Sequence, residues 1–503
     1  MNTFLIQDNA MGLVSPLFPF DNSYARELPG FYVDWEGARV PEPSLVLFNT
    51  SLAQELGLQT SALETPQGAA IFTGMVKPEG SSPLAQVYAG HQFGGFSPQL
   101  GDGRALLLGE IIDTNGRRRD IQLKGSGPTP FSRGGDGKAV IGPVLREYII
   151  GEAMHALGIP TTRALAAATT GETIFREGPK PGAVLTRVAS SHLRVGTFQF
   201  FAARGETEKV RQLADYAIAR HDPDLADTQD RYLKLLGRVI ERQASLIAKW
   251  VLVGFVHGVM NTDNTTISGE TIDYGPCAFI DAYNPAAVFS SIDHGGRYAF
   301  GRQPMIAQWN LARLAETLLA LIDPDDLDKA VERASSELGR FPELYKSAWL
   351  DGMRAKTGLQ GKEEGDQSLV EALLTMMQNQ NVDYTLLFRH LAHAANGNAE
   401  KARALFEAPE AFDAWLIDWR ERVSRQNIDH NATSTNMNQV NPAYIPRNHK
   451  VEEALQAAET GDYTLVKQLL EVLRTPYSEN PAHEAYANPP PGDFGPYRTF
   501  CGT

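Results

Sequence analysis

Cysteine and basic residues are scarce in this sequence. Only two cysteines occur among 503 residues, so a framework of disulfide bonds, on which small secreted domains depend, is excluded as the basis of the fold. Lys and Arg total 46 against 60 Asp and Glu, which gives a net charge of −14. This balance argues against a broad nucleic-acid-binding surface, whereas a nucleotide needs only a local basic cluster.

Long apolar runs are also missing. The most hydrophobic stretch near the candidate site, Trp250–Val256, is far too short to span a bilayer, and no charged and then apolar leader opens the chain. We therefore expect a cytoplasmic protein without a membrane partner. The length suffices for two or three domain-sized units with substantial cores.

The segment His257–Gly275 has the spacing of the metal-binding end of a kinase-like site. Kinase-like enzymes place an Asp early in the catalytic loop to accept a hydroxyl proton, an Asn five residues later for a metal ion, and a second metal-binding Asp in a D-F-G turn. Asn264 is in register with His257, and Asp273 opens an Asp-Tyr-Gly turn. Val259 occupies the position of the catalytic Asp, but a carboxylate is present nearby as Asp263.

Two β-favouring pieces, 265–267 and 271–272, flank Ser268-Gly269-Glu270 and predict a tight hairpin. Such a hairpin would bring Asn264 and Asp273 together. Two oxygen ligands suit a hard cation such as Mg²⁺, which keeps its other positions for water and phosphate oxygens. Taken singly, Asn and Asp beside glycines more often only form turns, so the hypothesis depends on their joint spacing.

A lysine and an acidic partner, as a kinase-like site requires, are present upstream. The strand 105–112 ends in the turn sequence Asp-Thr-Asn-Gly, and the next strand ends in Lys124. Glycine-rich segments at 125–127 and 134–137 follow, whose backbone amides could approach phosphate closely. A helix beginning near Pro143 carries Glu147, which we expect to pair with Lys124; the alternative is two surface charges without a function.

The organisation along the chain predicts an α+β protein with a protein kinase-like two-lobe fold. Residues 1–190 would form a strand-containing lobe with the phosphate-binding residues, and 191–479 a mainly helical lobe with the metal and the catalytic loop. Residues 480–503, rich in Pro and Gly, would form a flexible tail that carries Cys501. Within the helical lobe we expect helices over 231–253, 304–322, 401–425 and 451–473, and a linker or substrate-side loop over 428–449.

Further motifs carry a family resemblance that spans nearly the whole chain. They are YAGHQFG at 88–94, QLGDGR at 99–104, QLKGSG at 122–127, the segment 257–275, NPAYIPRNH at 441–449 and the terminal CGT at 501–503. On these segments the chain resembles the selenoprotein O family, kinase-fold proteins that transfer AMP to protein hydroxyls. Animal members have selenocysteine near the terminus, whereas this chain has Cys501, as most bacterial members do.

The resemblance implies a function and a set of site residues. Family members bind ATP in a flipped orientation, so that AMP passes to a Ser, Thr or Tyr hydroxyl of a protein substrate and pyrophosphate leaves. By this resemblance Asp263 is the proton acceptor, and Asn264 and Asp273 hold Mg²⁺ or Mn²⁺. The implied nucleotide contacts are Gly101, Gly103, Arg104, Lys124, Asp136, Gly137, Arg187, Arg194 and Asp273. Arginine suits this task because its guanidinium binds phosphate oxygens in pairs and stays charged.

The two cysteines suggest a redox hypothesis. Cys277 follows the Asp273 turn in the expected activation segment, and Cys501 lies on the tail, so a reversible disulfide could couple activity to redox state. The alternative is two unpaired thiols.

Two other functions remain open from the sequence. One is an ordinary kinase-fold phosphotransferase, for which Val259 is the adverse feature. The other is a catalytically silent nucleotide-binding regulator, against which the retained Lys124, Asn264 and Asp273 argue. Which phosphate of ATP is transferred distinguishes the first alternative from AMP transfer.

Overall fold

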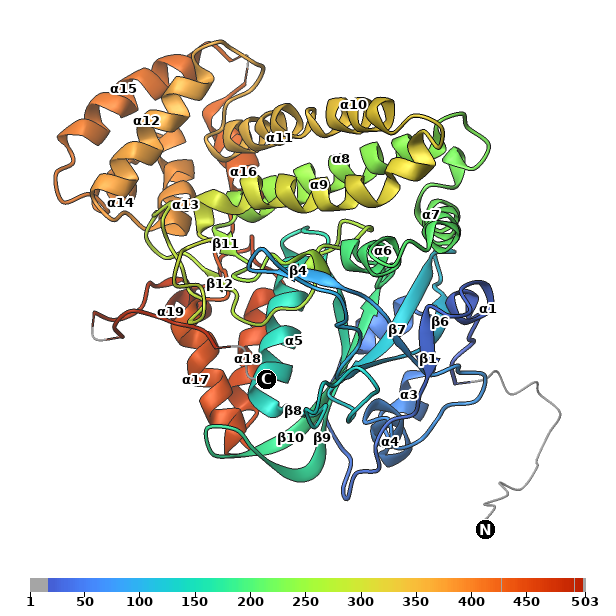
Figure 1. The fold of residues 1–503 in the computed structure, drawn as a ribbon. Helices are drawn as coiled ribbons and strands as arrows, with labels where there is room; N and C mark the ends of the chain where they lie inside the picture. Colours follow the sequence, from blue (N-terminus) through green and yellow to red (C-terminus); the bar gives the residue numbers. More distant parts are fainter. Residues whose placement is uncertain (1–16, 427, 493, 501–503) are drawn as a thin grey trace.

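The computed structural model describes residues 17–426, 428–492 and 494–500. Within them, an N-terminal antiparallel sheet is followed by a mainly helical C-terminal region, so the protein is of the mixed α+β class (Figure 1). Among these residues, none of the helices combines the length and apolar character that crossing a bilayer requires.

The sheet has eight strands in the order β1-β3-β6-β7-β10-β9-β2, with β8 paired to β10. The strands are β1 (Tyr32–Asp34), β2 (Ser44–Phe48), β3 (Leu84–Gln86), β6 (Ala105–Ile112), β7 (Arg118–Lys124), β8 (Ala139–Val140), β9 (Arg163–Phe175) and β10 (Pro179–Ala189). Two short pairs lie outside it: β4 (Gly90–Gln92) with β5 (Gly95–Ser97), and β11 (Phe255–Val256) with β12 (Ala278–Phe279).

The predicted turn between β6 and β7 is formed by its own residues. The Asp113 carboxylate accepts hydrogen bonds from the backbone N–H groups of Asn115 and Arg117, and Gly116 adopts a φ of 76°. A β-bulge between Leu107 and Gly109 then shifts the register by one residue, so that Ala105 pairs with Lys124 at the end of a central strand.

Successive side chains of a strand point to opposite faces of the sheet, so its apolar residues line both faces. Helices cover both of them. Helix α5 (Ile141–Ala156) packs on one face, where Leu107 and Leu185 join its core. The other face is covered by α2 (Thr50–Glu55), α3 (Thr60–Leu63) and α4 (Pro66–Phe72), with Leu106 and Val184 in that core.

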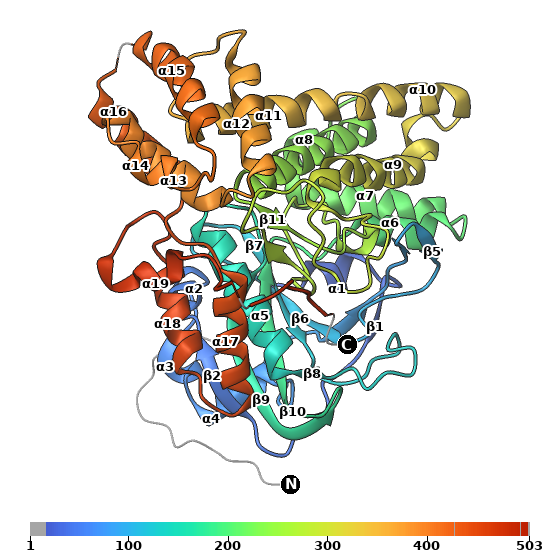
Figure 2. The ribbon, with the colours of Figure 1, turned by 90° about the vertical axis from the view of Figure 1, so that its left-hand side faces the viewer.

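The helical region forms two groups (Figures 1 and 2). The first packs against the segment 257–275, called the catalytic segment below after its predicted role. It includes α6 (Val195–Ala202), α7 (Thr207–His221), α8 (Arg231–Leu252), α9 (Gln303–Ile322), α10 (Leu327–Leu338) and α11 (Phe341–Lys356). The second has its own core and includes α12 (Asp366–Asn379), α13 (Tyr384–Ala395), α14 (Glu400–Arg403), α15 (Glu410–Ser424) and α16 (His430–Val440). Finally, α17 (Asn448–Glu459) and α18 (Thr464–Leu473) return to pack beside α5.

Three predicted boundaries are wrong. The expected helix 401–425 is two helices, because Pro409 cannot continue a helix and precedes the start of α15. The expected helix 451–473 is interrupted at Gly461, whose φ of 90° lies in the left-handed region. The span 428–449 is not a linker, since Asp429 caps α16, whose Met437 is fully buried.

The composition predicted a flexible tail, but its described part packs against the rest of the molecule. The Tyr497 hydroxyl lies 2.7 Å from a Glu452 carboxylate oxygen on α17. The Thr499 N–H donates to the Phe289 carbonyl at 2.8 Å, and its hydroxyl donates to the Pro276 carbonyl at 2.8 Å. The last described residues, up to 500, therefore run beside the segment that follows Asp273.

A buried arginine joins three parts of the helical region. Arg447, only 1% exposed, contacts Asp281 and Asp383 through Nη1, each at 2.8 Å, and its Nη2 donates to the Ala487 carbonyl. Removing one member of a buried ion pair leaves the other charge uncompensated.

We therefore expect Arg447→Met to lower the free energy of unfolding by about 3–5 kcal/mol. Urea unfolding followed by circular dichroism measures this change. Arg403→Met, which removes the exposed Arg403–Asp413 pair, is the control and should have little effect. Equal stability of the two variants would contradict a structural role for Arg447.

Candidate active site

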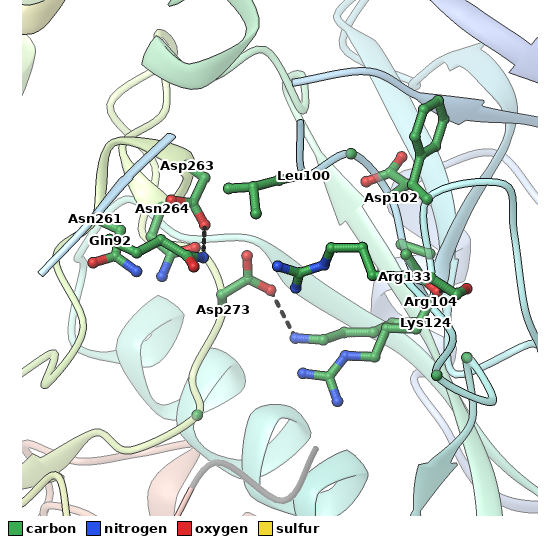
Figure 3. A pocket seen from close by; sticks show the side chains of 18 of the residues that line it. Gln92, Leu100, Asp102, Arg104, Lys124, Arg133, Asn261, Asp263, Asn264 and Asp273 are labelled. Atoms are coloured by element: carbon green, nitrogen blue, oxygen red, sulfur yellow. Dashed lines mark hydrogen bonds and ion pairs between the residues drawn. The ribbon is translucent and has the colours of Figure 1, made fainter. Parts of the chain in front are cut away.

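A cavity of about 470 Å³ lies between the sheet, the glycine-rich loops and the segment around Asp273 (Figure 3). It is lined by every residue for which the sequence predicted a nucleotide, metal or proton-transfer role. These are Gly101, Gly103, Arg104, Lys124, Asp136, Gly137, Arg187, Arg194, Asp263, Asn264 and Asp273. The structure thus brings together residues that are up to 172 positions apart in the chain.

Asp273 is the electrostatic centre of this cavity. Its Oδ1 lies 2.7 Å from Lys124 Nζ and 2.7 Å from Arg187 Nη1, and its Oδ2 lies 2.8 Å from Arg194 Nη1. Burial favours the protonated acid, but these three cations outweigh it and hold the pKa of Asp273 well below its usual range. Asp273 also has a φ of 62°, a left-handed conformation that is uncommon for residues other than glycine and that concentrates at functional sites.

Glu147 closes the network from α5. Its Oε2 lies 2.6 Å from Lys124 Nζ, and its Oε1 lies 3.0 Å from Arg187 Nη1. Although burial opposes ionisation, Lys124 and Arg187 lower the pKa of Glu147. Three cations and two carboxylates therefore leave an excess of positive charge directed at the cavity.

Asp263 lies in the short 3₁₀ turn Thr262–Asn264, next to Arg194, whose Nη1 donates to the Asp263 carbonyl at 2.7 Å. Gln92 Nε2 donates to its Oδ2 at 3.3 Å (Figure 3), whereas its buried Oδ1 has no hydrogen-bond partner among the described residues. Burial raises the pKa of Asp263 to about 6. A carboxylate with a pKa this close to neutral is a stronger base than an exposed one.

Gly90 on β4 leaves the space that the Asp263 carboxylate fills. A Cβ at position 90 would overlap Asp263 Oδ1 well inside van der Waals distance. Gly90 has no positive φ, so its lack of a side chain is required by this contact rather than by its backbone conformation.

Asn264 and Asp273 are suited to hold a metal ion. The Asn264 amide nitrogen donates to the Val259 carbonyl at 2.9 Å, which leaves the amide oxygen available to the cavity that the residue lines. No group of three or more His, Cys, Asp and Glu side chains that could hold a metal occurs in the described part of the chain. A pair of oxygen ligands fits Mg²⁺ or Mn²⁺, which can take its remaining ligands from phosphates and water.

The predicted hairpin between Asn264 and Asp273 is wrong. Instead of pairing with each other, its two pieces pair with different segments: Thr266 forms an antiparallel bridge with Arg194, and Thr271 a parallel bridge with Thr161. His257 supports the end of this loop, because its buried Nε2 lies 2.8 Å from the Ile272 carbonyl. Long-range pairing therefore places Asn264 and Asp273.

The glycine-rich loops pack too closely to carry side chains. Gly101 has a φ of 82° and lies against the Phe131 ring, and Gly137 has a φ of 63° and lies against the Gly127 carbonyl. Asp136, in the second loop, forms a 2.9 Å ion pair with Arg176 and is 44% exposed. Of the acidic residues predicted to contact nucleotide, it is the one that faces the solvent side of the cavity.

Residues that the sequence analysis did not select complete the site. Gln122 Oε1 accepts hydrogen bonds from Arg187 Nε at 3.2 Å and Nη2 at 2.6 Å, and Arg194 lies over the Tyr88 ring at 4.7 Å. Asp102 is buried and lines the cavity. Gln122 could have been found from strand periodicity, since residues two apart share a face and Lys124 is already assigned.

The predicted cysteine pair is only partly within the described residues. Cys277 is buried in the large core that includes α5 and α8, and Cys501 lies outside the described residues. The hydrogen bond from Thr499 to Pro276 brings the described end of the chain next to the residue that precedes Cys277. The disulfide remains a prediction.

Comparisons with known proteins show which family the chain resembles in sequence. Residues 18–474 match the family described as "Protein adenylyltransferase SelO". The chain is 60% identical over 488 residues to "Protein nucleotidyltransferase YdiU" of Cereibacter sphaeroides strain KD131, covering 97% of this chain and 100% of the relative. It is 58% identical over 504 residues, with 100% of both chains covered, to the protein of the same name from Rhizobium leguminosarum bv. trifolii. The same name applies to a Rhizobium meliloti protein that is 58% identical over 489 residues, 97% of this chain and 99% of the relative.

We expect Gly90→Ala to lower nucleotide transfer to protein by about a hundredfold, because the added methyl group would displace the Asp263 carboxylate. Labelled nucleotide attached to protein measures the activity, and thermal unfolding checks that the variant is folded. Gly95→Ala, on the other strand of the same hairpin and in open surroundings, should retain full activity. Full activity of Gly90→Ala would show that the position of Asp263 is not critical.

Proposed function

The chain belongs to the SelO family of protein adenylyltransferases, and from this premise we propose that it transfers AMP from ATP to Ser, Thr or Tyr hydroxyls of proteins. We further propose that the sheet with α5 and the helical region with the catalytic segment correspond to the two lobes of a protein kinase-like fold. The observation that carries the proposal is the charge arrangement of the cavity, which combines a cluster of cations on Asp273 with the separate, buried carboxylate of Asp263.

The cation cluster supports binding of the β- and γ-phosphates. Lys124, Arg187 and Arg194 converge on Asp273, and two further guanidinium groups, those of Arg104 and Arg133, line the cavity. Neither Arg104 nor Arg133 has an ion-pair partner within the described residues. A triphosphate provides the anionic oxygens that these groups lack, and paired N–H donors on each arginine suit phosphate.

Asn264 and Asp273 would hold Mg²⁺ or Mn²⁺ through their side-chain oxygens. When bound, such an ion would neutralise negative charge that develops on the phosphates during transfer.

Asp263 is assigned as the general base. The acceptor oxygen attacks the α-phosphorus, its proton passes to the Asp263 carboxylate, and the bond from the α-phosphorus to the oxygen that bridges to the β-phosphorus breaks. The electron pair of that bond leaves with pyrophosphate. Val259 cannot accept a proton, which accounts for a base displaced from the position used by kinases.

Labelled ATP tests this assignment. Purified protein incubated with Mg²⁺ or Mn²⁺, a protein acceptor and ATP should attach label from the α-phosphate and not from the γ-phosphate. Asp263→Asn should lower the rate by about 10²–10⁴-fold, the usual contribution of a general base, while the exposed Asp227→Asn serves as a matched control. Attachment of γ-label alone would identify a phosphotransferase, and attachment of neither label would identify a silent nucleotide-binding regulator.

Metal binding can be measured apart from activity. We expect Asp273→Asn to weaken binding of Mn²⁺ in the presence of a non-hydrolysable ATP analogue by about 10–100-fold, as seen by electron paramagnetic resonance. Asp227→Asn, which changes an exposed carboxylate outside the cavity, should bind Mn²⁺ as the wild type does. Unchanged Mn²⁺ affinity in Asp273→Asn would remove this residue from the metal site.

A further inference from the structure

A second cavity, of about 920 Å³, adjoins the first. Its walls come from the first turns of α5, from β10 and α17, and from residues 494 and 496–500 near the chain end. Figure 2 shows the C-terminal segment running across the region of α5 and α17. None of the roles discussed above uses this space.

The two cavities meet at the phosphate end of the site. Four residues line both of them: Arg104, Lys124, Arg176 and Gly275. Asp263, Asn264 and Val259 line only the first cavity. The second cavity therefore adjoins the first at Arg104 and Lys124, whereas Arg187, Arg194 and Asp263 line the first cavity alone.

The charge of the second cavity is opposite to that of the whole chain. Six basic side chains line it against four acidic ones, although the net charge of the protein is −14. The basic residues are Arg104, Lys124, Arg146, Arg176, Lys180 and Arg498, and the acidic residues are Glu147, Glu177, Glu452 and Glu459. Three of the basic side chains pair with acidic residues of the same wall, Lys124 with Glu147, Arg146 with Glu452 and Lys180 with Glu459, and Arg176 pairs with Asp136. Arg104 and Arg498 have no ion-pair partner among the described residues, and net positive charge in a cleft attracts small anions.

We propose that the second cavity is the exit route for pyrophosphate. This inference rests on the proposed AMP transfer. In an in-line displacement the leaving oxygen lies opposite the attacking one, so pyrophosphate forms on the side of the α-phosphorus that faces away from the acceptor. In the proposed reaction the acceptor approaches from the side of Asp263, and the leaving pyrophosphate faces Arg104 and Lys124, which also line the second cavity.

The C-terminal segment forms the outer wall of this route. Tyr497 is held by Arg146 on α5 and by Glu452 on α17, and Thr499 is held by Phe289 and Pro276. The Phe500 side chain lines the cavity but is 62% exposed. Gln456, an exposed residue of α17, lies on the same wall, so both positions can be changed without disturbing the core.

The test adds a bulky side chain to the cavity wall at Gln456 and removes one at Phe500. Rapid quenching measures AMP attached to protein in the first turnover, and a fluorescent coupled assay measures free pyrophosphate in the same reaction. We expect Gln456→Trp to leave AMP attachment unchanged and to delay free pyrophosphate by about tenfold, so that product release limits turnover. Phe500→Ala should release pyrophosphate at least as fast as the wild type and should shorten the delay when combined with Gln456→Trp.

Gln468→Trp, on the exposed face of α18 and away from both cavities, is the control for a new surface tryptophan. Simultaneous appearance of attached AMP and free pyrophosphate in Gln456→Trp would overturn the exit route and show that pyrophosphate leaves past the acceptor. Failure of the wild type to attach α-label would instead overturn the proposed function, and the exit route with it.

Discussion

The contact of Asp273 with three cations is the interaction on which the rest of the site depends. Lys124 comes from β7, Arg187 from β10, and Arg194 from the residue before α6, and Glu147 on α5 completes the network. Each of these side chains is largely buried, and a buried charge without its partner is strongly destabilising. The sheet, α5 and the catalytic segment must therefore be assembled together, and the site cannot form in one part of the chain alone.

The same network leaves net positive charge in the cavity, because three cations pair with two carboxylates. Hydrogen bonds within the protein hold the cationic groups in fixed orientations. Gln122 fixes the guanidinium of Arg187, and the Tyr88 ring supports that of Arg194. Donors that are oriented in advance need little reorganisation when charge develops on a bound group, which is how preorganised sites stabilise that charge.

Asp263 and the paired cations give the cavity its chemical character. Arg194 joins them, because its Nη1 contacts both the Asp273 carboxylate and the Asp263 carbonyl. The second cavity shares Arg104 and Lys124 with the first, and described residues near the C-terminus form part of its wall. Segments far apart in the sequence thus line two adjoining cavities, from Gln92 on β4 to Phe500.

The sequence by itself determined the parts that depend on local chemistry. The Asp-Thr-Asn-Gly turn joins β6 to β7, the strand that ends in Lys124, and the spacing of Asn264 and Asp273 identified the segment that holds them. Only the tertiary structure decided how that segment is held, since Thr266 and Thr271 pair with Arg194 and Thr161 and not with each other. It also decided that Asp263 packs against Gly90 and that Gln122 accepts hydrogen bonds from Arg187. Such contacts join residues 65 to 173 positions apart, and no local propensity or periodicity specifies which distant segments will meet.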